Sequence, residues 1–247
     1  MTKKALFYFI LSFFVFNNFA LANKLTIGYV NFPPYEYQED GIPKGILVEI
    51  AKNIFNKANI EIHLKFLPFK RAFKMTKSGQ IDGLFNFYKT DVRIPFFDYT
   101  EPIIKNPLVF FVRKDSVLEY SKLEDLKGLK IGVMSGYTYG TRFDKNNLFR
   151  REPTNSHDAN FKKLILKRID AYPCDNLVGI HVARRNKLYA KVKILKKPLK
   201  VMDGYIGFTK KKHLTTIKKI NKIIMKMHSN SEIKHYIYNY IKKSNQY

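Results

Sequence analysis

The sequence predicts an α/β fold built from two units, because two separate stretches of the chain alternate between strand-like and helix-like patterns. Strand-like runs have an apolar residue at every second position, whereas helix-like runs have apolar residues three and four positions apart. The length agrees with two units, since 247 residues exceed the size of most small domains. A hydrophobic content of 45% with 26% charged residues is typical of chains that bury a core.

The first unit is predicted from five consecutive segments. Residues 25–29 alternate as a strand, residues 46–58 carry a helical apolar stripe, and residues 60–66 alternate again. Residues 68–79 form a short helix that a proline opens and a glycine ends, and residues 81–87 form a third strand. Strands separated by helices predict a parallel, doubly wound sheet.

A second unit repeats the alternation further along the chain. Two strands and the helix face between them are predicted at 130–134, 161–165 and 169–175. An apolar strand at 107–113 is expected to cross between the units, and 205–209 is expected to return. Two amphipathic helices, at 214–227 and 233–241, follow.

The N-terminus has the three parts of a secretory signal peptide. Lys3 and Lys4 precede an apolar run over 5–16, and the small residues of Ala20-Leu21-Ala22 follow. A membrane anchor is the alternative, but spanning a bilayer takes about 20 residues and this run is shorter. We therefore expect cleavage after Ala22 and export to the periplasm. No later segment is long and apolar enough to span a bilayer.

The formal net charge of +25 raises the question of an acidic partner such as nucleic acid. The basic residues are mostly lysines and are scattered, whereas nucleic-acid readers favour arginine for its forked contacts. A lysine-rich composition without nucleic-acid binding is the better interpretation. Cys174 is the single cysteine, so it forms no internal disulfide, and we assign it no chemical role.

The sequence lacks the familiar catalytic and cofactor motifs. It has no Gly-x-Ser-x-Gly, no His-Glu-x-x-His, no Cys-x-x-Cys and no phosphate-binding Gly-x-x-x-x-Gly-Lys. Gly132, Gly136 and Gly140 follow a predicted strand without matching the dinucleotide fingerprint, and are interpreted as a loop that approaches a ligand. We expect neither a cofactor nor a metal.

Several segments, taken in order, resemble the family 3 extracellular solute-binding proteins, the receptors of amino-acid uptake systems. Each motif is short, but together they cover the chain after the signal segment. They are Gly28 to Tyr35 with Pro33-Pro34, Gly41 to Gly45, Pro68 to Ala72, Ser78 to Gly83, Lys89 to Arg93, Phe97 to Pro102, Leu126 to Thr138, Arg168 to Asp175 and Tyr205 to Lys210.

The resemblance implies the periplasmic-binding-protein fold, with two α/β lobes joined by two hinge strands and a ligand enclosed between them. Residues 23–106 and 204–247 would form the first lobe, and 107–203 the second. The expected function is that of a monomeric receptor that delivers an amino acid or related carboxylate to the membrane permease of an ABC transporter.

The resemblance also implies ligand contacts. Arg93 matches the family's arginine for the α-carboxylate, and Asp175 matches the acid for the α-ammonium. Thr138 would offer its backbone N–H and its hydroxyl to the carboxylate. Tyr35 and Phe32 would pack against the ligand's side chain. Each residue could instead be structural, with Arg93 on the surface and Asp175 or Thr138 only capping a helix.

The sequence departs from the family just ahead of Arg93. Small hydroxyl residues are usual there, but this chain has Asn86, Tyr88 and Lys89. We therefore hypothesise that the ligand is smaller or more anionic than an ordinary amino acid, for example an acidic amino acid. Arg71 belongs to a motif of one branch of the family and could contact an anionic ligand or lie on a solvated helix face.

Two other functions stay open at this point. One is an enzyme on the same scaffold, similar to the cyclohexadienyl dehydratases, for which Glu36, Glu101 and Asp175 are candidate acids. The other is the ligand-binding module of a sensory system, which would act through a partner protein.

Overall fold

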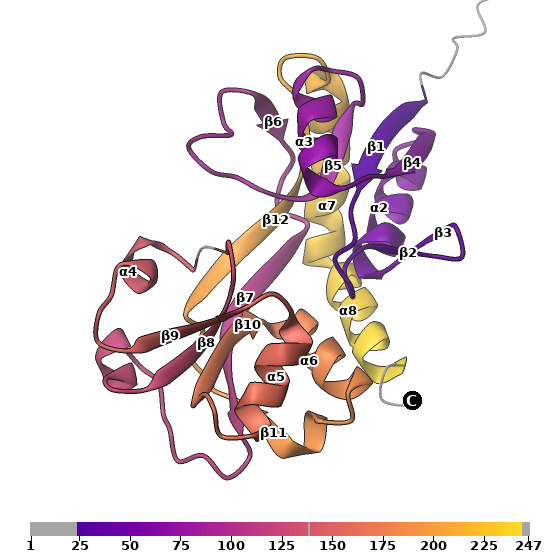
Figure 1. The fold of residues 1–247 in the computed structure, drawn as a ribbon. Helices are drawn as coiled ribbons and strands as arrows, with labels where there is room; N and C mark the ends of the chain where they lie inside the picture. Colours follow the sequence, from indigo (N-terminus) through magenta and orange to yellow (C-terminus); the bar gives the residue numbers. More distant parts are fainter. Residues whose placement is uncertain (1–23, 138, 244–247) are drawn as a thin grey trace, which may run out of the picture.

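The computed structural model describes residues 24–137 and 139–243, so the predicted signal segment and Thr138 lie outside the described residues. Figure 1 shows two α/β halves connected by two long strands, β7 (Ile104–Arg113) and β12 (Lys200–Thr209). These strands pair antiparallel in the middle of a ten-stranded sheet. Eight of its strands follow the order β4-β1-β5-β12-β7-β10-β8-β9, and the remaining two, β6 (Phe97–Tyr99) and β11 (Val192–Ile194), pair with β12 and β7. The predicted two-unit α/β fold is confirmed.

In the first half, β1 (Leu25–Tyr29) lies between β4 (Ile62–Phe66) and β5 (Gly83–Tyr88), and both pairings are parallel. Figure 1 shows three helices beside these strands: α2 (Ile46–Lys57), α3 (Phe69–Lys77) and α7 (Leu214–Ser229). Strand β5 begins two residues later than the sequence predicts. The amide N–H groups of Gln80 and Ile81 both donate to the Met75 carbonyl, which keeps this segment in the turn that ends α3.

In the second half, β10 (Ala171–Asp175) pairs antiparallel with β7 and parallel with β8 (Lys130–Met134). Helices α5 (His157–Ile165) and α6 (Asn176–Arg185) contact these strands. Strand β9 (Arg150–Thr154) at the sheet edge was not predicted, because its charged sequence lacks apolar alternation. An edge strand needs only one paired side, so backbone hydrogen bonds to β8 suffice.

The short elements also escaped prediction. They are the hairpin of β2 (Tyr37–Glu39) and β3 (Ile42–Lys44), the strands β6 (Phe97–Tyr99) and β11 (Val192–Ile194), and the four-residue helix α4 (Thr141–Asp144). Segments of three or four residues are too short for an apolar periodicity to show. They matter to the site because β2 and α4 follow segments that line the cavity described below.

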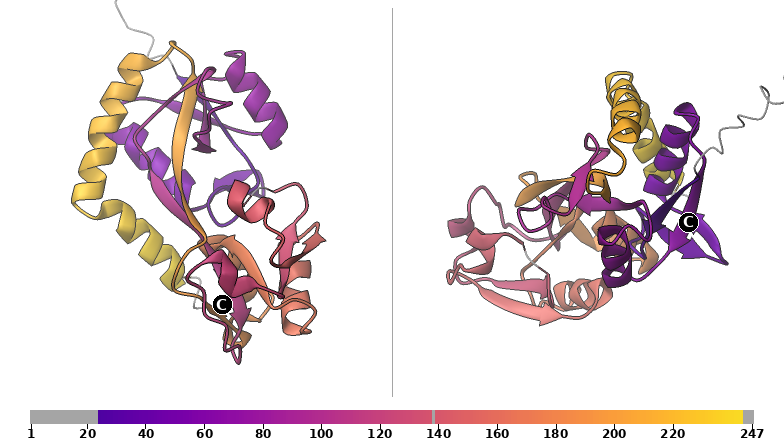
Figure 2. Two further views of the ribbon diagram at one scale, coloured as in Figure 1. Left: turned by 90° about the vertical axis from the view of Figure 1, so that its left-hand side faces the viewer. Right: turned by 90° about the horizontal axis from the view of Figure 1, so that it is seen from above.

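The last helix, α8 (Glu232–Lys243), reaches from the first half toward the second, as Figures 1 and 2 show. It packs on α2 and α7, and the Arg184 guanidinium of α6 donates to the Ile241 carbonyl at 3.1 Å. The largest cluster of buried apolar residues likewise includes residues of both halves, among them Ile27, Phe55, Phe111 and Phe161. Among the described residues, no helix is long and apolar enough to cross a membrane.

Candidate functional site

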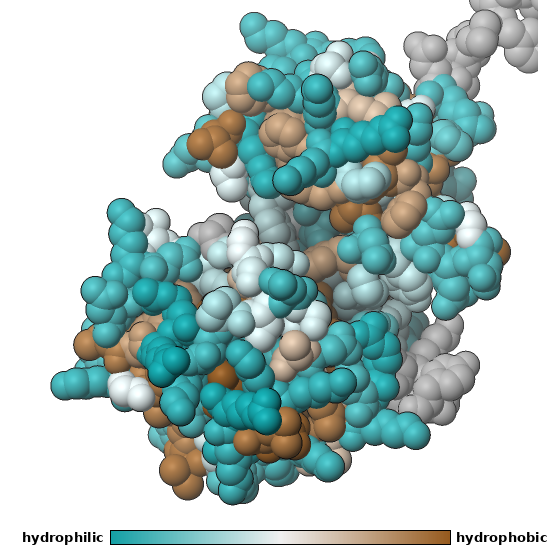
Figure 3. All heavy atoms as spheres, viewed as in Figure 1, coloured by the Kyte–Doolittle hydropathy of each residue, from teal (hydrophilic) through white to brown (hydrophobic). Residues whose placement is uncertain are grey.

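A cavity of about 920 Å³ lies between the two halves, and Figure 3 shows the surface hollowed there. Its walls come from segments far apart in the sequence: the turn after β1, the end of β5, the end of β10 and the first part of β12. The lining residues with the greatest bearing on function are Phe32, Glu36, Asn86, Tyr88, Arg93 and Asp175.

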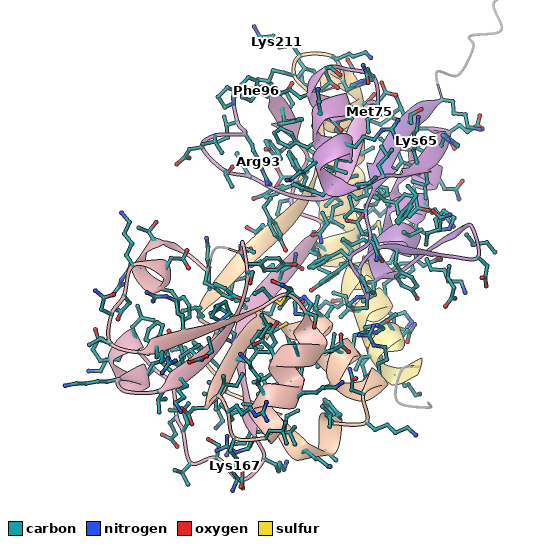
Figure 4. All side chains as sticks on the ribbon, viewed as in Figure 1. Lys65, Met75, Arg93, Phe96, Lys167 and Lys211 are labelled. Carbon is teal, nitrogen blue, oxygen red and sulfur yellow. The ribbon has the colours of Figure 1, made fainter. Side chains whose placement is uncertain are left out.

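Arg93 contributes a positive charge that no carboxylate among the described residues neutralises by an ion pair. It lies in the turn after β5, closed by its own amide N–H donating to the Thr90 carbonyl at 2.9 Å (Figure 4). Its Nη1 donates to the Tyr88 carbonyl at 3.0 Å, and its guanidinium carbon lies 4.6 Å from the centroid of the Phe87 ring. Partial burial lowers the pKa of Arg93, but a guanidinium stays charged in proteins. Its remaining donors can receive a carboxylate.

Asp175 contributes a carboxylate that is only half satisfied. It ends β10 and caps α6, because its Oδ1 accepts from the amide N–H groups of Leu177 and Val178 at 3.0 and 3.1 Å. The same oxygen accepts from the Tyr35 hydroxyl at 2.7 Å. The other oxygen, Oδ2, is buried and has no hydrogen-bond partner among the described residues. Burial raises the pKa of Asp175 to about 6, although its hydrogen bonds oppose the rise, so it is largely ionised at neutral pH.

Glu36 is a second buried carboxyl in the same cavity, and the sequence analysis weighed it only as an enzyme's acid. Its side chain is buried, with the residue 1% exposed, and its Oε2 has no hydrogen-bond partner in the part of the chain that the structure describes. Burial raises its pKa to about 8, while a backbone hydrogen bond at Val30 opposes this. The sequence places Glu36 between Tyr35 and Tyr37, shortly after Pro33-Pro34, but full burial of a glutamate is rare and only the structure shows it here.

Asn86 and Tyr88 line the cavity beside an asparagine that the sequence analysis missed. Asn106, on β7, is 1% exposed and its Nδ2 donates to Asn86 Oδ1 and to the Tyr88 hydroxyl, both at 3.1 Å. Asn86 has a φ of 45°, and Gly204 opposite leaves room for it, since a Cβ there would lie 2.5 Å from Asn86 Oδ1. Because its oxygen already accepts from Asn106, the Tyr88 hydroxyl has its own proton left to donate.

Phe32 and Tyr35 stack on each other but differ in their access to the cavity. Phe32 lines the cavity and stacks on Tyr35, with ring centroids 5.4 Å apart and planes 16° apart. Tyr35 is fully buried and is not among the residues that line the cavity, and the expected packing of its ring against a ligand side chain stays a prediction. Its ring fills the space behind Phe32, and only its hydroxyl reaches a site residue, Asp175.

Arg71 and Thr138 are the other two predicted site residues. Arg71 is exposed on α3 and is not among the residues that line the cavity, which favours the solvated helix face, and its contact with an anionic ligand stays a prediction. Thr138 lies outside the described residues, and its proposed contact stays a prediction. Its neighbours Tyr137, Tyr139 and Gly140 do line the cavity, and Gly140 has a φ of 109°, as suits a loop that approaches a ligand.

Several other residues line the cavity, and of these the sequence analysis singled out Lys89 alone for the ligand. His157 and Cys174 face the cavity from the second half, and the His157 Nδ1 lies 2.5 Å from the Tyr172 hydroxyl. Burial lowers the pKa of His157, so its ring is neutral at pH 7. Lys89 and Lys200 stand at the rim, both exposed. In the part of the chain that the structure describes, no three His, Cys, Asp or Glu side chains gather as a metal site.

A cavity between two α/β halves, with a guanidinium from one and a carboxylate from the other, defines a two-lobed binding protein that encloses a small polar molecule. The model of the bacterial extracellular solute-binding proteins, family 3, matches residues 25–243, and the chain belongs to this family. The resemblance found in the sequence is thereby confirmed.

Relatives of known activity fit this membership. The arginine-binding extracellular protein ArtP of Bacillus subtilis is 26% identical over 215 residues, which is 85% of this chain and 83% of ArtP. An ancestral arginine-binding protein bound to arginine is 25% identical, with a TM-score of 0.66 over 87% of this chain and 97% of that one. Substrate-binding domain 2 of Lactococcus lactis GlnP, in its open conformation, is similar in fold, with 24% identity, a TM-score of 0.70 and coverage of 86% and 93%.

Proposed function

We propose that this chain is the periplasmic receptor of an ABC uptake system and that it binds an L-α-amino acid with a cationic side chain, such as arginine. The single observation on which this rests most is that one cavity holds the unpaired Arg93 guanidinium together with two buried carboxyl oxygens that have no partner. The predicted signal segment supports export, and the permease and ATPase would be separate proteins.

The main-chain groups of an amino acid account for Arg93 and Asp175. A zwitterion that leaves water loses strong hydration at both ends and needs a charged partner for each. The Arg93 guanidinium would bind the α-carboxylate by two parallel hydrogen bonds, and Asp175 Oδ2 would accept from the α-ammonium. Phe32 would provide an apolar surface for the ligand's aliphatic part.

Glu36 is the reason for proposing a cationic side chain. A buried carboxyl oxygen without a partner is costly, and a guanidinium or ammonium group supplies both donors and charge. The names of the arginine-binding relatives support the same class of ligand. An acidic ligand would depend on Lys89 and Lys200, but these are exposed, and water screens them. The geometry therefore favours a ligand with a cationic side chain over the acidic amino acid that the sequence suggested.

Binding would be coupled to closure of the two halves. Arg93 and Asp175 stand on opposite sides of β7 and β12, so a ligand that touches both interacts more strongly with the closed arrangement. We propose that the moving bodies are residues 23–106 with 204–247 and residues 107–203. The permease would recognise the closed form.

A calorimetric titration of residues 23–247 at pH 8 tests the proposal with L-arginine, L-lysine, L-glutamine, L-glutamate and prephenate as probes. We expect the two cationic amino acids to bind most tightly and L-glutamate to bind weakly or not at all. Tighter binding of L-glutamate would contradict the ligand class, and turnover of prephenate would contradict the receptor function in favour of an enzyme.

A further inference from the structure

One hydrogen bond joins the two walls of the cavity directly. The Tyr35 hydroxyl donates to Asp175 Oδ1 at 2.7 Å, between residues 140 positions apart in the sequence. Tyr35 belongs to the turn after β1, and Asp175 ends β10, with β5, β12 and β7 between them in the sheet. The acceptor is a carboxylate, so the bond belongs to the stronger, charge-assisted class. It is formed only while the two halves lie close together.

The turn holds the Tyr35 hydroxyl at a fixed point. The Tyr35 amide N–H donates to the Phe32 carbonyl at 2.9 Å, and the Tyr35 carbonyl accepts from the Leu47 amide at 2.8 Å. The start of α2 lies so close that a Cβ on Gly45 would come within 2.4 Å of the Tyr35 carbonyl oxygen. With its ring stacked on Phe32 and fully buried, Tyr35 has no freedom to turn its hydroxyl elsewhere.

The hydrogen bonds of Asp175 are distributed unequally between its two oxygens. Oδ1 accepts from the Tyr35 hydroxyl and from the amide N–H groups of Leu177 and Val178, whereas Oδ2 is buried and accepts from none. The two amides come from α6 itself, so they would allow the carboxylate to swing about the helix end. The third donor comes from the other half and fixes the rotation, which leaves Oδ2 as the oxygen available to the cavity.

We propose that Tyr35 is a positioning residue for ligand recognition: its hydroxyl holds Asp175 with Oδ2 presented to the ligand's ammonium group and ties this orientation to the closed arrangement of the halves. This inference rests on the proposed function. It assigns Tyr35 a role through another residue rather than a contact with the ligand.

The protonation of Asp175 offers a readout that simple packing would not move. The hydrogen bond from Tyr35 lowers the pKa of Asp175 against the larger effect of burial, so its loss raises that pKa further. Tyr88 and Cys174 also face Asp175, but burial raises the pKa of each far above neutrality. Asp175 is therefore the member of this group that titrates near pH 6.

The test compares Tyr35→Phe, which keeps the buried ring and removes only the donor, with Tyr29→Phe as a matched control. Tyr29 is also buried, and among the described residues the hydrogen bond of its hydroxyl goes to Gln38, at 3.5 Å, rather than to Asp175. The probe is L-arginine, titrated calorimetrically between pH 5 and pH 8. We expect Tyr35→Phe to weaken binding about tenfold at pH 7, because the loss of a hydrogen bond to a charged group typically changes an equilibrium constant by at least that factor. The further loss of affinity near pH 6, where Asp175 takes up its proton, should also move to higher pH, whereas the rise toward pH 8 that Glu36 causes should stay. Tyr29→Phe should match the unmodified protein.

A second measurement needs no ligand. Protein labelled with ¹³C at the aspartate carboxyls gives a titration curve for Asp175, identified as the signal missing in Asp175→Asn. We expect a higher midpoint in Tyr35→Phe. An unchanged midpoint, or an unchanged dissociation constant in a protein that binds L-arginine, overturns the proposal. If the unmodified protein binds no L-arginine, the proposed function fails, and the carboxyl titration alone decides whether Tyr35 positions Asp175.

Discussion

Arg93 and the two carboxyls Glu36 and Asp175 face the same cavity in different surroundings. Arg93 is half-buried, contacts the Phe87 ring and donates to a backbone carbonyl, which leaves its charge unopposed. Glu36 and Asp175 are buried, and each leaves one oxygen without a partner. Although opposite charges share the cavity, they form no ion pair with each other among the described residues. The protein therefore keeps its positive and negative groups apart in the cavity. A ligand that carries both a negative and a positive charge would supply the missing partner for each group.

The Arg93 side of the comparison predicts the largest effect. Arg93→Ala should weaken binding of L-arginine roughly 1000-fold, because losing a buried charged partner costs about 4 kcal/mol. Arg71→Ala is the matched control, since Arg71 is exposed outside the cavity and should leave the dissociation constant within about twofold. Titration calorimetry measures both. A loss of less than about tenfold for Arg93→Ala would show that the carboxylate binds elsewhere.

Asp175 predicts the next largest effect. Asp175→Asn removes the charge but keeps an oxygen to cap α6, so binding of L-arginine should weaken roughly 100-fold while the melting temperature changes little. The ligand 5-guanidinopentanoate, which lacks the α-amino group, provides the control. It should bind the variant and the unmodified protein about equally. Equal losses for both ligands would exclude the proposed contact with the ammonium group.

Glu36 predicts a smaller and pH-dependent effect. A cation favours the ionised carboxylate, so below the pKa of about 8 binding must displace a proton, and affinity should rise with pH by up to about tenfold per unit between pH 6 and 8. Glu36→Gln should remove this rise and weaken binding roughly tenfold at pH 8.5, where Glu36 is ionised. Calorimetry across this pH range measures the effect. The exposed carboxylate of Glu101 supplies the control, Glu101→Gln, and a slope that persists in Glu36→Gln would assign it to another group.

The smallest loss of affinity is expected from a change at Tyr88, which lines the same cavity as Arg93 and Asp175. Its oxygen accepts from Asn106, so its proton is free for the ligand, and Tyr88→Phe should weaken binding about threefold. Tyr99→Phe is the control, because its buried hydroxyl has no partner and lies outside the cavity. Calorimetric titration with L-arginine at pH 8 measures both variants. An unchanged affinity in Tyr88→Phe would mean that the hydroxyl makes no ligand contact.

The sequence predicted the long helices and strands with regular apolar periods better than the short or charged elements. The apolar periods of 25–29, 46–58 and 130–134 come from burial on one face of a strand or helix, and burial leaves a direct trace in the sequence. Strand β9 leaves none, because it is charged and held by backbone hydrogen bonds that any residue can make. One cavity brings together five residues that the family motifs, or the departure from them ahead of Arg93, singled out, and their ligand contacts stay predictions: Phe32, Asn86, Tyr88, Arg93 and Asp175.

What the sequence by itself determined is the order of strands and helices, the family and the cavity residues that short motifs mark. Local periodicity and glycine or proline punctuation depend on near neighbours in the chain, so they can be recognised without a fold. Only the tertiary structure decided that the buried Tyr35 hydroxyl reaches Asp175, that Arg71 is exposed on α3, and that Glu36 lines the cavity. It also decided that Asn106 hydrogen-bonds to two lining residues, Asn86 and Tyr88. These roles depend on burial and on partners up to 140 positions away, and no spacing rule encodes which distant side chain will satisfy a given polar atom.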